Sequence, residues 1–201
     1  MTSAQTMYFE RVAHTYLKAG GQGLWGRLRS AEWRAVRDCL EPEPGMDVLD
    51  AGCGAGYYSL RLRDEAGARV AGVDSSPAMI AAYREQGFKG HIGPIEMFGT
   101  DKRYDRILIA GVLEFIERPG PALENLAGLL RSGGRIAALV PAAGLAGAAY
   151  RAVHRLRGCP AFIRDPDWYL RLALSSGLET VKFAKATPIS CAFSLRRPDH
   201  G

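Results

Sequence analysis

Three glycines at alternate positions, Gly52, Gly54 and Gly56, follow the stretch DVLDA and precede an apolar pair spaced as in a helix. Glycine lets the backbone approach a ligand with no Cβ in the way. One glycine is enough for a tight strand-to-helix turn, so three of them beside Asp50 favour a turn that holds a ligand. In an open parallel sheet such a turn lies at the carboxyl ends of the strands, where these sheets bind ligands.

A second acid, Asp74, stands eighteen residues beyond Gly56, at the end of the next predicted strand. A carboxylate at that place can accept hydrogen bonds from both hydroxyls of a ribose. Asp74 could instead cap the following helix, but Ser75 or Ser76 already fills that role. The pattern therefore predicts a nucleoside-containing ligand.

The residues just after the turn narrow the identity of that ligand. The dinucleotide fingerprint G-x-G-x-x-G would need glycine at position 57, and this chain has Tyr57. No tyrosine is followed four residues later by lysine, the pairing of short-chain dehydrogenases. An NAD-linked oxidoreductase is therefore the less favoured enzyme class.

The elements that must position these residues alternate between short β-rich runs and helical windows. Strands are expected at residues 47–51, 69–74, 89–93, 105–111 and 135–141, and helices at 77–86, closed by Gly87, and at 121–131. Such alternation indicates parallel βαβ units with right-handed crossovers. Two last runs, 178–186 and 189–197, are joined directly by Thr-Pro and must pair antiparallel.

We expect one domain in four parts. Residues 1–44 form a helical cap, 45–141 the cofactor-binding core, 142–165 a lid insertion, and 166–201 a C-terminal helix with antiparallel strands. The lid is expected to be one helix over 142–160 that turns basic at its end, and Asp165 caps the next helix.

Composition limits the class of protein. The chain has 201 residues, 47% hydrophobic and 23% charged, with a net charge of +5, which is typical of a globular domain. Its four cysteines show neither a C-x-x-C pair nor histidine at ligand spacing, so we expect no metal site, reduced thiols and a cytoplasmic location. We expect no transmembrane segment, because the longest uncharged run, 136–150, falls short of about 20 residues.

Four blocks, VLDAGCGAG, VAGVDSSPAMI, YDRILIAGVLEFIERP and LLRSGGRIAALVP, lie in this order between Met46 and Pro141. Together they resemble the class I S-adenosylmethionine-dependent methyltransferase family. The resemblance implies an α/β, Rossmann-like doubly wound sheet of seven strands, mostly parallel with an antiparallel last strand, plus an N-terminal helical cap. It also implies S-adenosylmethionine as cofactor and S-adenosylhomocysteine (SAH) as product.

The resemblance implies which residues meet the cofactor. Asp50 and the glycine turn would meet its methionine part, Asp74 its ribose, and Met79 or Ser75 its adenine. Pro94 replaces an acid that faces adenine in the family, so Ile95, Glu96 and backbone groups would take over. The expected cofactor-binding residues are Asp50, Gly52, Cys53, Gly54, Gly56, Asp74, Ser75, Met79, Ile95, Glu96, Ala110 and Gly111.

Methyl transfer from a sulfonium is an in-line displacement that depends mainly on positioning of the acceptor atom. A base is needed only where the acceptor must lose a proton. Many relatives have histidine where this chain has Phe115, which rules out a base there. The candidate bases are His154, in the lid, and His14, in the cap, although each could be a plain surface or capping residue.

The acceptor is expected to be a small molecule. A basic cluster in the lid, Arg151, Arg155 and Arg157, is either a solvated helix face or a feature that favours an apolar acceptor with an anionic end, or contact with a membrane surface. We expect no nucleic-acid partner, because the fourth strand is followed by AGVLEF rather than an N/D-P-P-Y/F turn and no recognition domain is added. A non-catalytic cofactor-binding partner protein is the other alternative, and the oligomeric state is left open.

Overall fold

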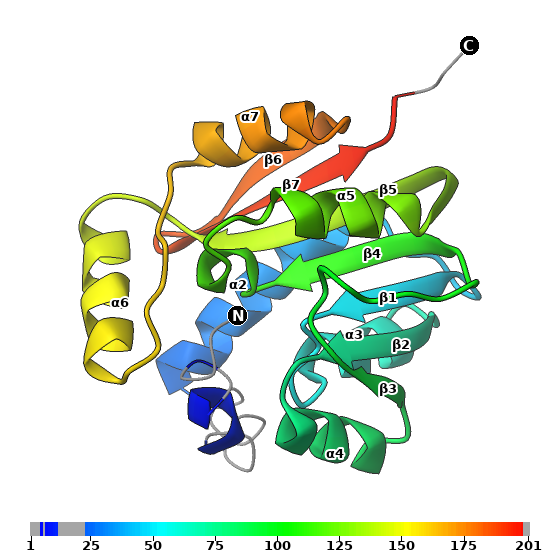
Figure 1. Ribbon diagram of the computed structural model, residues 1–201, viewed down its shortest axis with the longest axis horizontal. Coiled ribbons are helices and arrows are strands. Elements are labelled where there is room, and N and C mark those ends of the chain that lie inside the picture. Colours follow the sequence, from blue (N-terminus) through cyan, green and yellow to red (C-terminus); the bar gives the residue numbers. More distant parts are fainter. Residues whose placement is uncertain (1–4, 6, 12–22, 199–201) are drawn as a thin grey trace.

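The computed structural model describes residues 5, 7–11 and 23–198 and is built on one seven-stranded sheet with strand order β3-β2-β1-β4-β5-β7-β6 (Figure 1). The strands are β1 (Asp47–Ala51), β2 (Arg69–Asp74), β3 (Lys89–Ile92), β4 (Tyr104–Ala110), β5 (Leu130–Pro141), β6 (Glu179–Thr187) and β7 (Ser190–Arg196). The helices are α2 (Gly23–Leu40), α3 (Tyr57–Asp64), α4 (Pro77–Glu85), α5 (Gly120–Gly128), α6 (Leu145–Leu156) and α7 (Pro166–Ser175), with a 3-10 turn η1 (Leu113–Phe115).

The strand directions confirm the expected fold class. The first five strands pair in parallel, and β7 runs antiparallel to both of its neighbours, β5 and β6. The antiparallel last strand therefore lies inside the sheet, and β6 forms the edge.

Two expected helices are shorter than their patterns indicated. The helix expected over 121–131 ends at Gly128, because Leu130 already pairs with Tyr104 as the first residue of β5. The helix expected over 142–160 spans Leu145–Leu156 only. It begins after Gly144 and ends before Gly158, both of which have positive φ.

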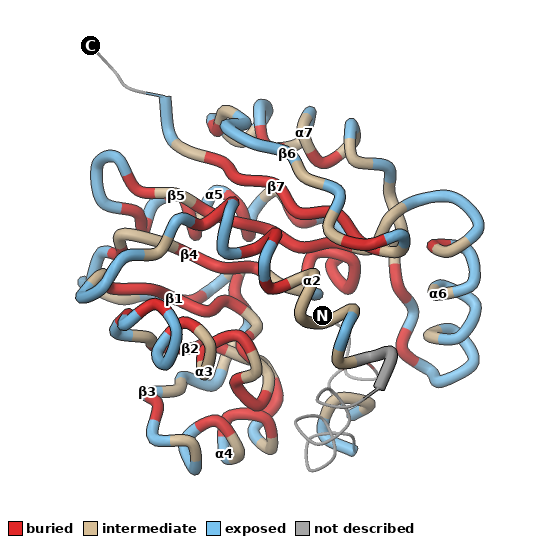
Figure 2. The backbone as a smooth tube through the Cα atoms, turned by 180° about the vertical axis from the view of Figure 1, so that it is seen from behind, coloured by how far each residue is buried: buried red, intermediate tan, exposed pale blue. Residues whose placement is uncertain are grey.

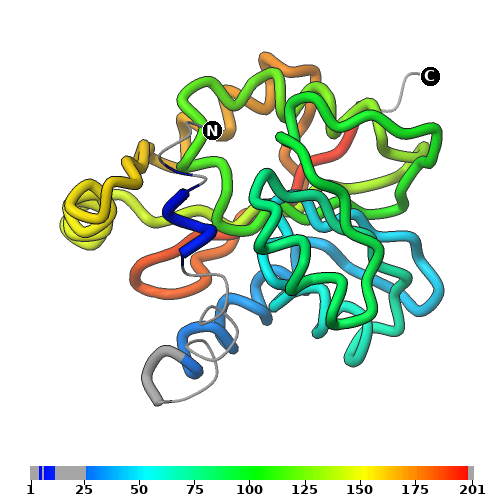
Figure 3. The backbone as a smooth tube through the Cα atoms, turned by 60° about the horizontal axis from the view of Figure 1, so that its bottom comes forward, coloured from blue at the N-terminus to red at the C-terminus, as the bar shows by residue number. Residues whose placement is uncertain are grey.

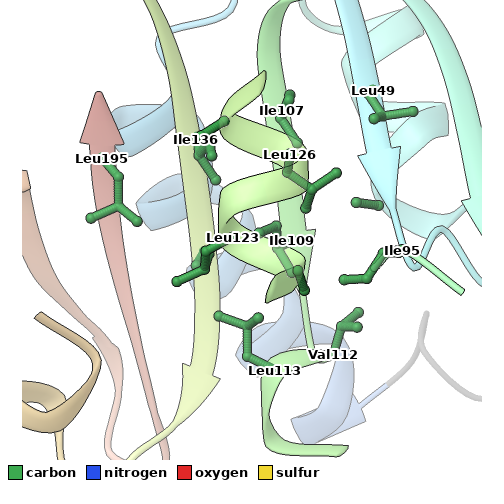
Figure 4. Packing of buried hydrophobic residues seen from close by; sticks show 14 of the residues in the cluster. Leu49, Ile95, Ile107, Ile109, Val112, Leu113, Leu123, Leu126, Ile136 and Leu195 are labelled. Carbon is green, nitrogen blue, oxygen red and sulfur yellow. The ribbon is translucent and has the colours of Figure 1, made fainter. Parts of the chain in front are cut away.

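Helices cover both faces of the sheet. On one face α5 and α7 pack against the strands, with Leu123 and Leu126 of α5 above Ile109 and its neighbours (Figure 4). On the other face α2 and α3 bury Trp33, Tyr58 and others against the alternate strand residues. Successive residues of a strand face opposite layers, and because helices cover both faces, β1 and β7 are buried along nearly their whole length (Figure 2). Within the described residues, no helix is both long enough and apolar enough to cross a membrane.

At the amino ends of the strands, one buried carboxylate binds three cationic side chains. Asp47, at the start of β1, accepts hydrogen bonds from Arg69 Nε (3.0 Å) and Lys102 Nζ (2.9 Å), and from Arg131 Nη2 (3.1 Å). These cations lower the pKa of Asp47 well below its usual range.

The Asp47→Asn variant is expected to lose about 1–2 kcal/mol of unfolding free energy at neutral pH, because it keeps the shape but removes the charge that the three half-exposed cations share. Urea denaturation checks this. The matched control is Asp64→Asn, an exposed acid paired with Arg63 at 2.7 Å, which is expected to change nothing measurable. Equal effects of the two variants would contradict a structural role for the Asp47 cluster.

Candidate functional site

A cavity opens at the carboxyl ends of β1, β2 and β4. It lies at the strand ends where parallel sheets bind ligands. Of the expected cofactor residues, those that line it are Asp50, Gly52, Cys53, Gly54, Asp74, Ser75, Met79, Ile95, Glu96, Ala110 and Gly111. The others that line it, most of them not anticipated, are Phe9, Arg29, Tyr57, Tyr58, Gly93, Pro94, Val112, Phe115 and Ile116.

The glycine turn is pinned to β2 by its own backbone. Gly52 N donates to Val73 O at 2.7 Å and Cys53 N donates to the same oxygen at 3.1 Å. Gly54 N donates to Asp74 Oδ2 at 2.9 Å. Gly52 and Gly54 both have positive φ, where a side chain would be strained. The turn therefore presents bare main chain to the cavity in a fixed shape.

Asp74 joins the turn to the next helix. Its Oδ1 accepts from Ser76 N at 2.9 Å while Oδ2 holds Gly54 N. Burial raises the pKa of Asp74, and these backbone hydrogen bonds oppose the rise. Ser76, not Asp74, caps α4, since its hydroxyl accepts from Met79 N at 3.2 Å. Asp74 is therefore a cavity carboxylate oriented by backbone N–H groups, with lone pairs left for a ligand.

Asp50 is a different kind of acid. It is only 2% exposed, and its Oδ2 accepts from Ser59 Oγ at 2.7 Å. Ser59 Oγ lies 2.8 Å from Tyr83 Oη, which extends the network under the turn. Burial raises the pKa of Asp50 to about 7. Asp50 therefore lines the cavity as a nearly buried carboxyl group, and it is readily protonated near neutral pH.

The loop after β3 forms the wall beside α4. Asn125 Nδ2, from α5, donates to Ile95 O and to Phe98 O, both at 2.9 Å. Pro94 and Ile95 thus stand at the cavity in a fixed place, although the family's acid is missing there. Glu96 lines the same wall beside them.

The opposite end of the cavity is apolar. Phe9 and Phe115 meet edge to face at 5.2 Å between ring centroids, and both line the cavity with Ile116 and Val112. The N-terminal helical piece that carries Phe9 reaches this place because Gln5 Nε2 donates to Phe115 O (3.0 Å) and Pro160 O (2.8 Å). Figure 3 shows that piece beside the turn after β4.

Two ionisable residues that the sequence pattern did not mark belong to this region. Arg29 of α2 lines the cavity and lies over the Tyr57 ring at 4.8 Å. Glu114, in η1 between cavity residues, is only 1% exposed. Its Oε1 accepts a long hydrogen bond of 3.5 Å from Tyr150 Oη, whereas its Oε2 has no partner among the described residues. Burial raises the pKa of Glu114 to about 8.

Two expected site residues lie away from the cavity, and a third is not described. Gly56 does not line the cavity: a Cβ there would come 3.1 Å from the Tyr83 ring. His154 packs among Phe115, Tyr150 and Tyr8, behind the cavity wall, and burial lowers its pKa. His14 lies outside the described residues.

The cavity fits the cofactor that the resemblance implies. An adenosyl sulfonium needs close main-chain approach and a carboxylate for its ribose, and Gly52, Gly54 and Asp74 provide these at one cavity. Arg29 adds a cation to the lining of this cavity. An apolar region remains beyond Gly111, on the side of Phe115.

Comparisons with known proteins agree with this assignment. A family profile described as "Methyltransferase domain" matches residues 49–138. A tRNA U34 carboxymethyltransferase of Shewanella denitrificans is 30% identical over 113 residues, which are 52% of this chain and 34% of that protein. A ubiquinone biosynthesis O-methyltransferase of Nitrobacter winogradskyi is 35% identical over 100 residues, 47% of this chain and 38% of that protein. The matched part therefore spans about a third of the length of these relatives.

The fold is also found in solved structures. The magnesium protoporphyrin IX methyltransferase of Synechocystis PCC 6803, solved with bound SAH, superposes with a TM-score of 0.74 at 18% identity, over 96% of this chain and 98% of that one.

One expectation about partners is wrong. A nucleic acid was not expected because the chain lacks a base-methylation turn and a recognition domain, yet several relatives are named for a tRNA. That turn covers only one kind of nucleic-acid methylation, so its absence could not exclude the others. The profile over residues 49–138, the seven-stranded sheet and the glycine turn agree with the resemblance to the class I S-adenosylmethionine-dependent methyltransferases, whose cofactor is S-adenosylmethionine.

Proposed function

We propose that the protein transfers the methyl group of S-adenosylmethionine to an acceptor whose reacting group enters the apolar end of the cavity. This proposal rests on one observation: the region expected to hold the cofactor and the apolar region belong to the same cavity. The glycine turn and Asp74 line it together with Phe9, Phe115 and Ile116. The bound cofactor supplies an activated methyl group. The chain's own part is to hold the acceptor in line with it and to exclude water.

Each residue has a part in this proposal. Gly52 and Gly54 admit the cofactor's methionine part, with Arg29 at its carboxylate and Asp50 beneath it. Asp74 accepts from the ribose hydroxyls, while Met79 and Ile95 enclose the adenine. The division of the chain into cap, core, lid and C-terminal part, and a proton-accepting role for His154 or His14, stay predictions.

The acceptor's size is the finer part of the proposal. A small acceptor with an apolar body suits the Phe and Ile walls, and the relative named for ubiquinone biosynthesis is consistent with it. An RNA is the second candidate, favoured by the relatives named for tRNA and by the net charge of +5. Incubation with methyl-labelled cofactor and either a panel of phenolic and carboxylic acceptors or total tRNA decides between them. Label in neither pool would contradict the proposed transfer.

The Asp74→Asn variant is expected to bind SAH about 10–100-fold more weakly, because it loses the charge and one acceptor facing the ribose. Isothermal titration calorimetry measures this. Asp101→Asn, an exposed acid away from the cavity, is the matched control and is expected to bind as the wild type does.

Asp74 also orients the glycine turn, so the ribose contact needs a separate readout. The wild type should bind an SAH analogue that lacks one ribose hydroxyl more weakly than it binds SAH. Asp74→Asn should bind the analogue and SAH nearly equally, since the contact with that hydroxyl is already lost in the variant. Additive losses would show that Asp74 acts only through the turn and would overturn its ribose role.

A further inference from the structure

Helix α6 turns an apolar face to solvent. Leu145 is 93% exposed, Leu156 88% and Val153 44%, and Ala149 and Ala152 are exposed with them. Positions 145, 149, 152 and 156 follow the helical spacing of one face. The helix stands beyond the carboxyl ends of β4 and β5 in Figure 1 and is largely exposed in Figure 2. An amphipathic helix of a globular domain normally turns this face inward, and α6 does the reverse.

The orientation of α6 is fixed by its other face. Gly147 is buried, and a Cβ on it would come 2.4 Å from Ala142 O and 2.8 Å from Ile163 Cγ2. Tyr150 and His154, three and seven residues further on, pack their rings together at 4.3 Å, and His154 also contacts Phe115. These contacts hold the leucine face outward.

Positive charge flanks the outward face. Arg151 and Arg155 are exposed, one turn apart, and Arg157 follows the last residue of the helix. No Asp or Glu occurs from Asn125 to Arg164, so no acid on α6 or on the segments next to it in the chain offsets these arginines. No ion pair of Arg151 or Arg155 occurs among the described residues. The face therefore suits a partner that is apolar and bears negative charge around the apolar part.

We propose that α6 docks the protein on an anionic lipid bilayer, with Leu145, Val153 and Leu156 entering the acyl region. The arginines reach the headgroup phosphates, because their long stems let the charge stay at the interface while the leucines go deeper. At twelve residues, roughly 18 Å long, α6 lies along the surface and does not span it.

Other occupants fit the face less well. RNA would use the arginines, but base stacking needs aromatic or arginine planes and the outward stripe is leucine, valine and alanine. A protein interface of this size would be expected to centre on tyrosine, tryptophan or arginine. A second copy of the chain would bring the same arginines against each other.

The test is flotation of the full chain with vesicles of phosphatidylcholine alone and of phosphatidylcholine with phosphatidylglycerol. Wild type is expected to float with the anionic vesicles and about tenfold less with the neutral ones. Leu145→Ser/Leu156→Ser is expected to lose about tenfold or more in binding to anionic vesicles. Arg151→Gln/Arg155→Gln is expected to bind both vesicle types equally weakly.

The matched control is Leu174→Ser, which removes a leucine that is 72% exposed on another helix, α7, and is expected to float as the wild type does. Circular dichroism and SAH affinity, both expected unchanged, show that each variant is folded. Absence of flotation, or equal flotation of the Leu145/Leu156 variant and wild type, overturns the proposal. The proposal is also overturned if neither wild type nor any variant binds vesicles while wild type forms a dimer or retains RNA and these variants do not. Vesicle binding needs neither cofactor nor acceptor, so this test stands apart from that of the proposed transfer.

Discussion

The Gly52→Ala variant is expected to lose about 3–5 kcal/mol of unfolding free energy and nearly all affinity for SAH. Gly52 has φ +81°, and a Cβ there would lie 2.2 Å from Val112 Cγ2. Either the turn or Val112 must move, and both line the cavity. Urea denaturation and calorimetric titration with SAH measure the two effects.

A matched variant separates the clash from the backbone strain. Gly87 has φ +85°, but a Cβ there would meet nothing within 4 Å. Gly87→Ala should therefore show only the cost of a left-handed alanine, about 1–2 kcal/mol, with SAH affinity unchanged.

A second substitution can relieve the clash. In Gly52→Ala/Val112→Ala the nearest contact becomes the Cβ of residue 112, at 3.2 Å from the new Cβ, so part of the stability should return. If Gly52→Ala costs no more than Gly87→Ala, or if the second substitution only adds to the loss, the turn does not depend on close approach to Val112.

The glycine turn and its surroundings could be predicted because the rules that govern them are local. Alternating glycines after a buried strand, an acid at the end of the next strand, and parallel topology together placed Gly52, Gly54 and Asp74 at one cavity. The serine-proline start of α4 was equally readable, since an N-cap and the following proline act on their own turn.

Gly56 shows where local rules stop. Its glycine serves the packing of the Tyr83 ring and the left-handed start of α3, rather than a ligand. The sequence around Gly56 does not show that glycine is required there for packing rather than, as at Gly52, for the shape of the turn. Tyr83, the residue that requires it, is 27 positions away.

Phe9, Arg29 and Glu114 were missed for a related reason. Phe9 and Arg29 reach the site through contacts between segments distant in the chain, such as the hydrogen bond from Gln5 to Phe115 O. Glu114 stands next to cavity residues in the chain, but its contact with Tyr150 is of the same distant kind. Periodicity marks a helix as amphipathic but does not say which face the protein covers. Helix α6, whose apolar face is turned outward, is the clearest case.

Glu114 is expected to make the protein less stable as pH rises. Its pKa is about 8 in the folded protein, against 4.5 for an exposed glutamate. Between these values the folded protein keeps a proton that the unfolded chain releases, so the free energy of unfolding falls by about 1.4 kcal/mol per pH unit. Asp50, whose pKa is raised to about 7, adds to this slope below that pH.

The Glu114→Gln variant should remove the part of the slope that belongs to Glu114. Its advantage over wild type is expected to grow by about 3–5 kcal/mol between about pH 5 and about pH 9. Urea denaturation across this range measures it. Glu117→Gln, an exposed glutamate three residues on, is the control and should leave the slope unchanged.

A third variant tests the cause rather than the size of this effect. Tyr150 Oη donates to Glu114 Oε1 at 3.5 Å and so favours the charged carboxylate, which lowers a pKa that burial raises. Tyr150→Phe should therefore move the upper end of the pH dependence to higher pH, and it should have no such effect when combined with Glu114→Gln. A stability difference between wild type and Glu114→Gln that is constant with pH would show that Glu114 is already ionised in the folded protein, and burial would then not be what governs this carboxyl.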